Sequence, residues 1–300
     1  TAISNLDHSY LTLQGPPGAG KTYTGKRVIA ELMKSGARVG ITSNSHKAIN
    51  NLLLGTAKYC KDAGISASFS CTKETEPDLA EYDVAILKNS ELVNHIQPAS
   101  VIGTTAWGFA RDDIANQLDY LFVDEAGQVA VANLIAMSRS ATNLILLGDQ
   151  MQLGQPSQGI HPGESGLSVL DYLLSKTATI PADMGVFLGT TYRMHSRVNQ
   201  FISDHIYEGK LASHPGNDIR VIDVPEDYQG PLDINAGVLF IPVAHEGNSQ
   251  ASDEEVEEIR QLADALIGRT FHTGLNDSRV RAIGWDDILF VAPYNHQVSK

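Results

Sequence analysis

The feature that most constrains the fold is a glycine-rich octet, Gly-Pro-Pro-Gly-Ala-Gly-Lys-Thr, at residues 15–22. An apolar run, 11–14, precedes it, and a stretch with helical patterning, 25–35, follows it. Glycines permit the backbone angles that turn successive N–H groups inward, and a helix N-terminus adds the positive end of its dipole. The sequence therefore predicts a strand, a phosphate-binding loop and a helix in that order.

Apolar runs rich in β-branched residues recur along the chain and alternate with helical stretches. Several of these runs are apolar almost throughout, which is typical of parallel strands buried on both faces. The runs expected to be strands are 11–14, 38–42, 83–87, 100–104, 120–124 and 143–147. Alternating strands and helices predict an α/β fold with a doubly wound parallel sheet.

A second series of elements follows, with strands expected at 186–190, 238–243 and 288–292. Ser252 is expected to cap a helix that has three acidic residues in its first turn, where they complement the helix dipole. A chain of 300 residues is long enough for about two domains. We expect two doubly wound domains, residues 1–178 and 179–300.

Two carboxylates, Asp124 and Glu125, end the apolar strand expected at 120–124. Next to a phosphate-binding loop, such a pair supplies what nucleotide hydrolysis needs. Asp124 and the Thr22 hydroxyl are the expected ligands of Mg²⁺, and Glu125 is the expected base for the attacking water. Lys21 is expected to reach the β- and γ-phosphates. An exposed strand-end carboxylate without a catalytic role is the alternative for Glu125.

The net charge of −13 disfavours a protein that wraps duplex DNA on a broad basic face, but a narrow groove for a single strand stays possible. No apolar run approaches the ~18 residues of a membrane span, and no secretory signal pattern begins the chain. Cys60 and Cys71 stand in no metal-binding pattern, which suggests inert thiols and a cytosolic location.

Further motifs resemble those of superfamily 1 helicases, in the order found in that family. They are Asp124-Glu125-Ala126-Gly127-Gln128, Gly148-Asp149-Gln150-Met151-Gln152-Leu153, Thr191-Tyr192-Arg193-Met194-His195, Tyr207-Glu208-Gly209-Lys210-Leu211 and Val291-Ala292-Pro293-Tyr294-Asn295-His296-Gln297. Residues 42–52 and 101–106 are similar to the 5′-to-3′ branch, which holds the nonsense-mediated-decay helicase and a flap-trimming nuclease–helicase. The resemblance implies two RecA-like domains.

The resemblance also implies roles that spacing alone does not assign. Gln152 is expected to contact the γ-phosphate or its water, and Arg193 to act as an arginine finger from the second domain. A capping role for Gln152 and a surface ion pair for Arg193 are the alternatives. ATP is the implied nucleotide, with Mg²⁺ as cofactor. The residues expected to hold ATP are Gly15, Pro16, Pro17, Gly18, Ala19, Gly20, Lys21, Thr22, Tyr23 and Tyr192.

A single strand of DNA or RNA is the implied partner. Small polar residues at strand ends bind phosphates without sequence preference. The residues expected to contact the strand are Ser43, Asn44, His46, Thr104 and Thr105. Trp107, nearby in the sequence, is either a platform on which a base stacks or a partly buried side chain, and the second is the more common fate of tryptophan.

Two parts of the family's machinery are not found. No adenine-reading glutamine motif lies upstream of residue 11, and the late motifs that follow residue 297 are missing, so the second RecA-like domain is expected to be incomplete. Relatives in this branch often carry a RecB-like nuclease, and a nuclease domain is expected in the full-length protein. The favoured function is an ATP-dependent helicase or translocase motor. A non-catalytic nucleotide-sensing or nucleic-acid-binding module is the alternative, and a P-loop kinase is disfavoured.

Overall fold

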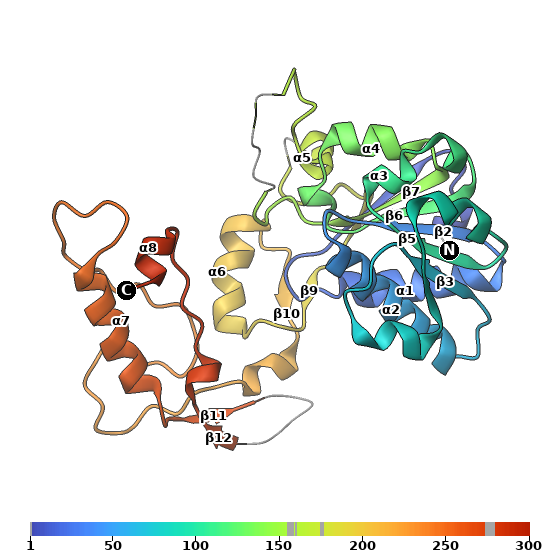
Figure 1. Ribbon diagram of the computed structural model, residues 1–300. Coiled ribbons are helices and arrows are strands. Elements are labelled where there is room, and N and C mark those ends of the chain that lie inside the picture. The colour runs from blue at the N-terminus through green and yellow to red at the C-terminus, as the bar shows by residue number, and fades with distance from the viewer. Residues whose placement is uncertain (1, 155–158, 160, 175–176, 274–279) are drawn as a thin grey trace. The chain divides into compact units, whose positions relative to one another are not determined.

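A computed structural model describes residues 2–154, 159, 161–174, 177–273 and 280–300 (Figure 1). The chain forms two compact units. The first contains Thr1–Thr191 and Ile206–Leu211, and the second contains Tyr192–His205 and Ala212–Lys300. The short segment 206–211 thus packs with the first unit although its flanking residues belong to the second.

A parallel sheet of eight strands forms the centre of the first unit, in the order β4-β3-β5-β2-β6-β7-β1-β8 (Figure 1). Every neighbouring pair is parallel, so all strands end at the same edge of the sheet. The strands are β1 (Tyr10–Gln14), β2 (Arg38–Thr42), β3 (Ser68–Cys71), β4 (Val84–Ile86), β5 (Ser100–Gly103), β6 (Leu118–Val123), β7 (Ala141–Gly148) and β8 (Gly185–Phe187). The expected α/β fold with a parallel sheet is confirmed.

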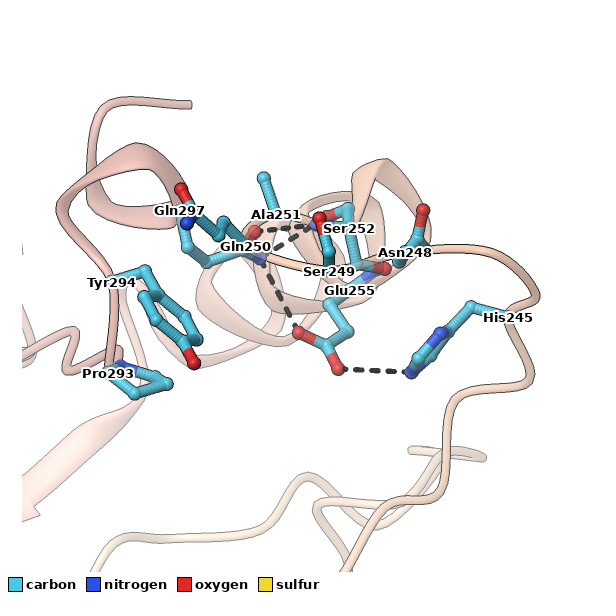
Figure 2. A pocket seen from close by; sticks show the side chains of 10 residues that line it. All are labelled: His245, Asn248, Ser249, Gln250, Ala251, Ser252, Glu255, Pro293, Tyr294 and Gln297. Atoms are coloured by element: carbon cyan, nitrogen blue, oxygen red, sulfur yellow. Dashed lines mark hydrogen bonds and ion pairs between the residues drawn. The ribbon is translucent and has the colours of Figure 1, made fainter.

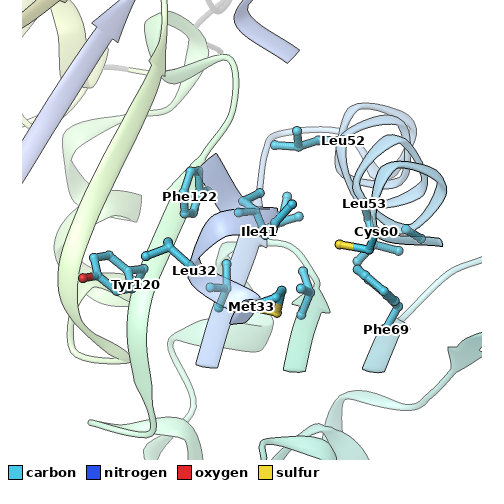
Figure 3. Packing of buried hydrophobic residues seen from close by; sticks show 14 of the residues in the cluster. Leu32, Met33, Ile41, Leu52, Leu53, Cys60, Phe69, Tyr120 and Phe122 are labelled. Atoms are coloured by element: carbon cyan, nitrogen blue, oxygen red, sulfur yellow. The ribbon is translucent and has the colours of Figure 1, made fainter. Parts of the chain in front are cut away.

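Helices on the sheet bury two apolar clusters. The larger contains residues of α1 (Lys21–Lys34) and α2 (His46–Asp62), and Figure 3 shows its packing around Ile41 and Phe122. The smaller contains residues near α3 (Ala106–Phe109), α4 (Val131–Ser138) and α5 (Val169–Leu174). Short 3₁₀ turns connect the elements at Ile3–Asn5, Pro77–Tyr82, Asn89–His95, Asp112–Ile114 and Ala126–Gln128.

The second unit contains helices, three short strands and long segments without regular structure in its described part. Ser252 caps α7 as expected, because its hydroxyl accepts a hydrogen bond from the Glu255 N–H at 3.2 Å. The elements are α6 (Ser196–Ile206), α7 (Asp253–Leu266), α8 (Asn295–Val298), β10 (Ala212–Ser213), β11 (Thr270–His272), β12 (Val280–Ala282) and the turns Pro215–Ile219 and Trp285–Asp287; β9 (Thr190–Thr191) precedes them. Strands β11 and β12 form an antiparallel pair.

Three expected strands of the second series are different in the structure. The run 186–190 contributes β8, which pairs with β1 in the sheet of the first unit. The runs 238–243 and 288–292 form no strand, and Phe240 and Leu289 are 89% and 86% exposed. A strand needs a neighbour to satisfy its N–H and C=O groups, and the described residues provide none for these two runs. Residues 179–300 therefore show no second parallel sheet in their described part.

Candidate functional site

The glycine-rich loop joins β1 to α1 at the carboxyl edge of the sheet. Gly18 and Gly20 have φ angles of 75° and 86°, values that side chains with a Cβ rarely adopt. The N–H of Gly15 donates to the Gly148 carbonyl at 2.9 Å, which fixes the start of the loop against the end of β7. In the described part, the N–H groups of Gly18, Gly20, Lys21 and Thr22 donate to no backbone carbonyl outside the helix. The loop therefore presents donors suited to a phosphate.

The side chains of the loop have different surroundings. The Lys21 ammonium donates to the Gly15 carbonyl at 2.9 Å, so it lies over the loop itself. Thr22 and Tyr23 are exposed, and the Arg27 guanidinium lies 3.4 Å from the centre of the Tyr23 ring. Pro16 and Ala19 are buried, whereas Pro17 is half-buried and accepts a hydrogen bond from the Thr191 hydroxyl at 2.9 Å. The hydroxyl of Thr22 is thus accessible to a ligand.

Asp124 follows β6, and Glu125 begins a 3₁₀ turn. The Asp124 carboxyl group is buried and accepts the Glu125 N–H at 3.0 Å. Burial away from water, together with the Glu125 charge, raises the pKa of Asp124 to about 6. The nearby Lys21 charge opposes this shift. Glu125 itself has a φ of 52°, an uncommon angle for a residue with a side chain, and strain of this kind often marks functional sites.

The turn after Glu125 packs against the loop after β7 at backbone distance. A Cβ added to Gly127 would lie 2.5 Å from the Asp149 carbonyl oxygen. A Cβ added to Gly148 would lie 2.8 Å from the Ala126 nitrogen. Only glycine permits this approach, which brings the Asp-Glu-Ala-Gly-Gln turn and the Gly-Asp-Gln loop together.

Asp149 is the centre of a buried hydrogen-bond network. Its Oδ2 accepts the Tyr207 hydroxyl at 2.7 Å and the Gln152 Nε2 at 3.1 Å. Its Oδ1 accepts the Met151 N–H at 3.2 Å and the Gln14 Nε2 at 3.4 Å. Burial, followed by the hydrogen bond to the Asp149 carboxylate, raises the pKa of Tyr207, so its hydroxyl is a donor at neutral pH. The expected catalytic residue Gln152 is thus held through Asp149.

Gln14 extends this network to the segment that leads into β8. Its buried amide donates to the Ala178 carbonyl at 2.8 Å and accepts the Ile180 N–H at 2.6 Å. Gln150 donates to the same Ala178 carbonyl at 2.9 Å. Neither Gln14 nor Tyr207 is among the site residues expected from the sequence. A polar residue ending an otherwise apolar strand was the available signal for Gln14.

The residues expected to contact nucleic acid lie after β2 and β5, which are neighbours in the sheet. Ser43 and Thr104 are buried, His46 and Thr105 are half-buried, and Asn44 is exposed. The Asn44 amide donates to the Gln128 carbonyl. Thr104 bonds to Asn89 at 3.0 Å and to Thr72 at 3.1 Å, so its hydroxyl is engaged within the protein.

Trp107 was expected to be partly buried, and this was wrong, because its side chain is 81% exposed. Trp107 lies in the one-turn helix α3, between Thr105 and the buried Gly108 and Phe109. The buried Phe109 anchors this turn in the core, and the Trp107 ring is left outside.

Arg193 and Tyr192 belong to the second unit and are both exposed. The Tyr192 ring packs on the His214 ring with 5.0 Å between ring centres. The backbone carbonyl of Arg193 accepts the Arg220 guanidinium at 2.6 Å. Within the first unit, the preceding residue Thr191 bonds to Pro17 of the glycine-rich loop.

Gln297, from the motif that resembles the late helicase motif, lines a small pocket of about 170 Å³ in the second unit (Figure 2). Its amide accepts the Ser252 N–H at 2.7 Å and donates to the Ser252 carbonyl at 3.2 Å. Glu255 lies between Gln297 and His245, and its carboxylate is 3.6 Å from the His245 ring (Figure 2). Gln297 therefore joins this motif to the start of α7.

Comparison with known proteins places this arrangement in a family. A family model described as an AAA domain matches residues 1–164, more than half of the chain. The chain belongs to the AAA domain family. A second model, also described as an AAA domain, matches residues 167–300.

The AAA chain is also similar to larger curated proteins. It is 24% identical to DNA-binding protein SMUBP-2 of Mesocricetus auratus over 96% of this chain and 34% of that protein. It is 28% identical to the DNA replication ATP-dependent helicase/nuclease DNA2 of Xenopus laevis over 69% of this chain and 20% of that protein. The chain thus spans about a third or less of these relatives.

Among solved structures, the Arterivirus nonstructural protein 10 helicase in complex with DNA aligns with a TM-score of 0.44 and 14% identity. The alignment covers 74% of this chain and 45% of that one. In its described residues, this AAA chain has no helix that is long and apolar enough to cross a membrane.

Proposed function

We propose that this AAA domain is an ATP-dependent motor that acts on single-stranded nucleic acid as a helicase or translocase. The observation that carries the proposal is that three loops meet at one sheet edge, where Gly127 lies against the Asp149 backbone and the Gly15 N–H donates to the Gly148 carbonyl. These loops carry Lys21, the pair Asp124–Glu125, and Gln152.

The chemistry we propose follows from the groups at this edge. The N–H groups of Gly18, Gly20, Lys21 and Thr22 bind the phosphates of ATP, and the Lys21 ammonium exchanges the Gly15 carbonyl for phosphate oxygens. The Thr22 hydroxyl and the Asp124 carboxylate would hold Mg²⁺, which neutralises phosphate charge when bound. The raised pKa of Asp124 fits this role, because a buried carboxylate short of positive charge favours a divalent cation.

Glu125 then acts as the base that orients and deprotonates the attacking water. Gln152 contacts the γ-phosphate or this water through its amide, which both donates and accepts hydrogen bonds. Arg193 stabilises the charge that develops on the transferred phosphoryl group, and Tyr192 stacks near the adenine. For Arg193 the support is its place in the Thr-Tyr-Arg-Met-His motif directly after Thr191.

The nucleic-acid strand would lie across the ends of β2 and β5, where Ser43, Asn44, His46, Thr104 and Thr105 are found. The relatives support this partner, since one is named a DNA-binding protein and another a DNA replication helicase/nuclease. Travel in the 5′-to-3′ direction, a nuclease domain elsewhere in the longer protein and a cytosolic location belong to the same proposal.

The test is ATP turnover with and without a single-stranded oligonucleotide, with DNA and RNA compared in parallel. We expect the strand to raise the turnover rate of wild type, and Lys21→Ala to abolish turnover. A rate that persists in Lys21→Ala would come from a contaminating enzyme. ATP binding without turnover, in the presence of a bound strand, would overturn the motor and favour the alternative function, a nucleotide-sensing or nucleic-acid-binding module.

A further inference from the structure

Three lysines differ from the others in having no partner for their ammonium groups. Within the described part of the chain, Lys47, Lys73 and Lys88 are exposed and make no ion pair, side-chain hydrogen bond or aromatic contact. Every other described lysine has a carboxylate, carbonyl or aromatic partner. These lysines with partners are Lys21, Lys26, Lys34, Lys58, Lys61, Lys210 and Lys300.

The three unpaired lysines lie together in the fold. Lys73 and Lys88 each come two residues after the end of a strand, β3 and β4, and Lys47 is the second residue of the helix that follows β2. With β5, these strands form one half of the sheet in the order β4-β3-β5-β2. Because the sheet is parallel, all of these strands end at the same edge, so the three lysines lie at that edge.

Hydrogen bonds connect the ends of these strands to one another. Thr104, after β5, bonds to Thr72, after β3, at 3.1 Å and to Asn89, after β4, at 3.0 Å. The Lys73 carbonyl accepts the Asn50 amide of α2 at 2.7 Å. Burial and then the charge of Lys73 lower the pKa of His46, which agrees with a position of Lys73 next to His46.

Local carboxylates do not neutralise Lys88. Glu91 is the nearest acidic residue in sequence, and its carboxylate accepts the backbone N–H of Lys88 at 2.8 Å. In a chain of net charge −13, three cations without a protein partner at one edge of the sheet give a polyanion a local site to bind.

Trp107 adds an aromatic surface to the same edge. Its neighbour Gly108 is so close to Asn89 and Thr104 that a Cβ there would lie 2.9 Å from the Asn89 Oδ1 and 2.4 Å from the Thr104 hydroxyl. Asn89 directly follows Lys88, shortly after the end of β4, so the turn that carries Trp107 lies beside the end of β4. The Trp107 ring is exposed there. Proteins bind single-stranded nucleic acid with cations that contact its sugar–phosphate backbone and with aromatic rings on which its bases stack.

We propose that the bound single-stranded nucleic acid crosses the ends of β3 and β4 as well as those of β2 and β5. Lys47, Lys73 and Lys88 contact its phosphates, and Trp107 stacks on one of its bases. This inference rests on the proposed function and assigns residues that the sequence motifs leave out. It identifies the ligand by its chemistry as a flexible polyanion with accessible bases.

The first experiment measures the salt dependence of binding. Fluorescence anisotropy with labelled oligothymidylate and oligouridylate compares wild type with the double variant Lys73→Ala/Lys88→Ala. We expect weaker binding and a slope of log Kd against log salt that is smaller by about 1.4, since each phosphate contact on a single strand contributes about 0.7. The control is Lys34→Ala/Lys61→Ala, with the same loss of charge on residues in the last turns of α1 and α2, and it should keep the wild-type slope.

The second experiment tests stacking. Trp107→Ala should weaken binding of oligothymidylate about 5- to 150-fold, the range for losing one base stacked on an aromatic ring. The same variant should bind an abasic strand as wild type does, because that strand has no base to stack. Trp107→Phe should recover most of the affinity. Trp285→Ala, another exposed tryptophan in the described part, is the matched control and should bind like wild type.

The outcomes separate this inference from the proposed function. If wild type binds neither oligonucleotide, the proposed function fails. If wild type binds and both Lys73→Ala/Lys88→Ala and Trp107→Ala bind equally well at every salt concentration, this inference fails and the proposed function stands. Thermal unfolding of each variant shows that it is folded, so a weaker complex is not caused by unfolding.

Discussion

The hydrogen bond from Tyr207 to Asp149 gives a sharp test of how Gln152 is held. The Tyr207 hydroxyl lies 2.7 Å from the Asp149 Oδ2, and the two residues are 2% and 3% exposed. Tyr207→Phe removes this donor and changes little else in shape. A buried hydrogen bond to a charged group contributes about 1.5–3 kcal/mol, so the free energy of unfolding should fall by that amount.

Catalysis should change in the same variant for a local reason. Gln152 shares the Asp149 Oδ2 with Tyr207, and without the hydroxyl the carboxylate binds the Gln152 amide more strongly. Turning that amide to the γ-phosphate or its water then becomes harder. A penalty of about 0.7–1.4 kcal/mol in the transition state corresponds to about 3- to 10-fold lower kcat. The KM for ATP should change little, because the N–H groups that bind phosphates lie in another loop.

The assays are chemical denaturation and steady-state ATP turnover. Tyr120→Phe is the control, since that buried hydroxyl donates to the neutral Ile3 carbonyl at 3.4 Å, outside the network. In a Gln152→Ala background, Tyr207→Phe should lower kcat no further, because its effect acts through Gln152. A variant that loses stability but retains the wild-type kcat would refute the reasoning and leave Tyr207 with a structural role only.

Three further predictions concern neighbouring residues of the same edge. Asp124→Asn should raise the free energy of unfolding at pH 7 by about 3 kcal/mol, because the pKa of Asp124 is about 6 in the fold against 3.8 in the unfolded chain. Denaturation repeated at lower pH should show this gain disappearing as the pH falls from 6 to 4. Gly127→Ala should lower the free energy of unfolding by about 1–3 kcal/mol, since its Cβ would lie 2.5 Å from a backbone oxygen. The control Gly55→Ala in α2 should be neutral or stabilising, because its Cβ would lie 3.7 Å from the nearest atom. Equal melting temperatures of the two variants would contradict this prediction. Asn44→Ala removes the hydrogen bond to Gln128 and should reduce the stimulation of ATP turnover by single-stranded nucleic acid more than the affinity for it. An unchanged stimulation would argue against this hydrogen bond as the connection between the two sites.

Most of the first unit could be predicted from the sequence because its signals are local, although β3 was not among the expected strands and β8 was expected in the second domain. Buried parallel strands are apolar along their length, and the glycine-rich loop needs a strand before it and a helix after it. Ser45 and Ser252 both cap helices in the structure, as serine before a helix is expected to do. Those features depend on neighbours a few residues away.

The rest depends on contacts that sequence spacing does not reveal. Tyr207 meets Asp149 across 58 residues, and Gln14 meets Ala178 across 164. The runs 238–243 and 288–292 have the composition of strands, but a strand forms only beside a partner strand, and β8 found its partner in β1 instead. The exposure of Trp107 likewise follows from the anchoring of Phe109, which no composition rule indicates.

The order of the strands gives a physical reason for coupling between the two proposed ligands. The loops that follow β6, β7 and β1 carry the proposed ATP site. The loops that follow β4, β3, β5 and β2 carry the proposed nucleic-acid site. The two halves meet where β2 lies beside β6. There the Asn44 amide bonds to Gln128, which ends the turn begun by Glu125 with its uncommon φ angle. A bound nucleic acid that moves Asn44 would therefore act, through one hydrogen bond and one short turn, on the backbone that positions Glu125, the proposed general base.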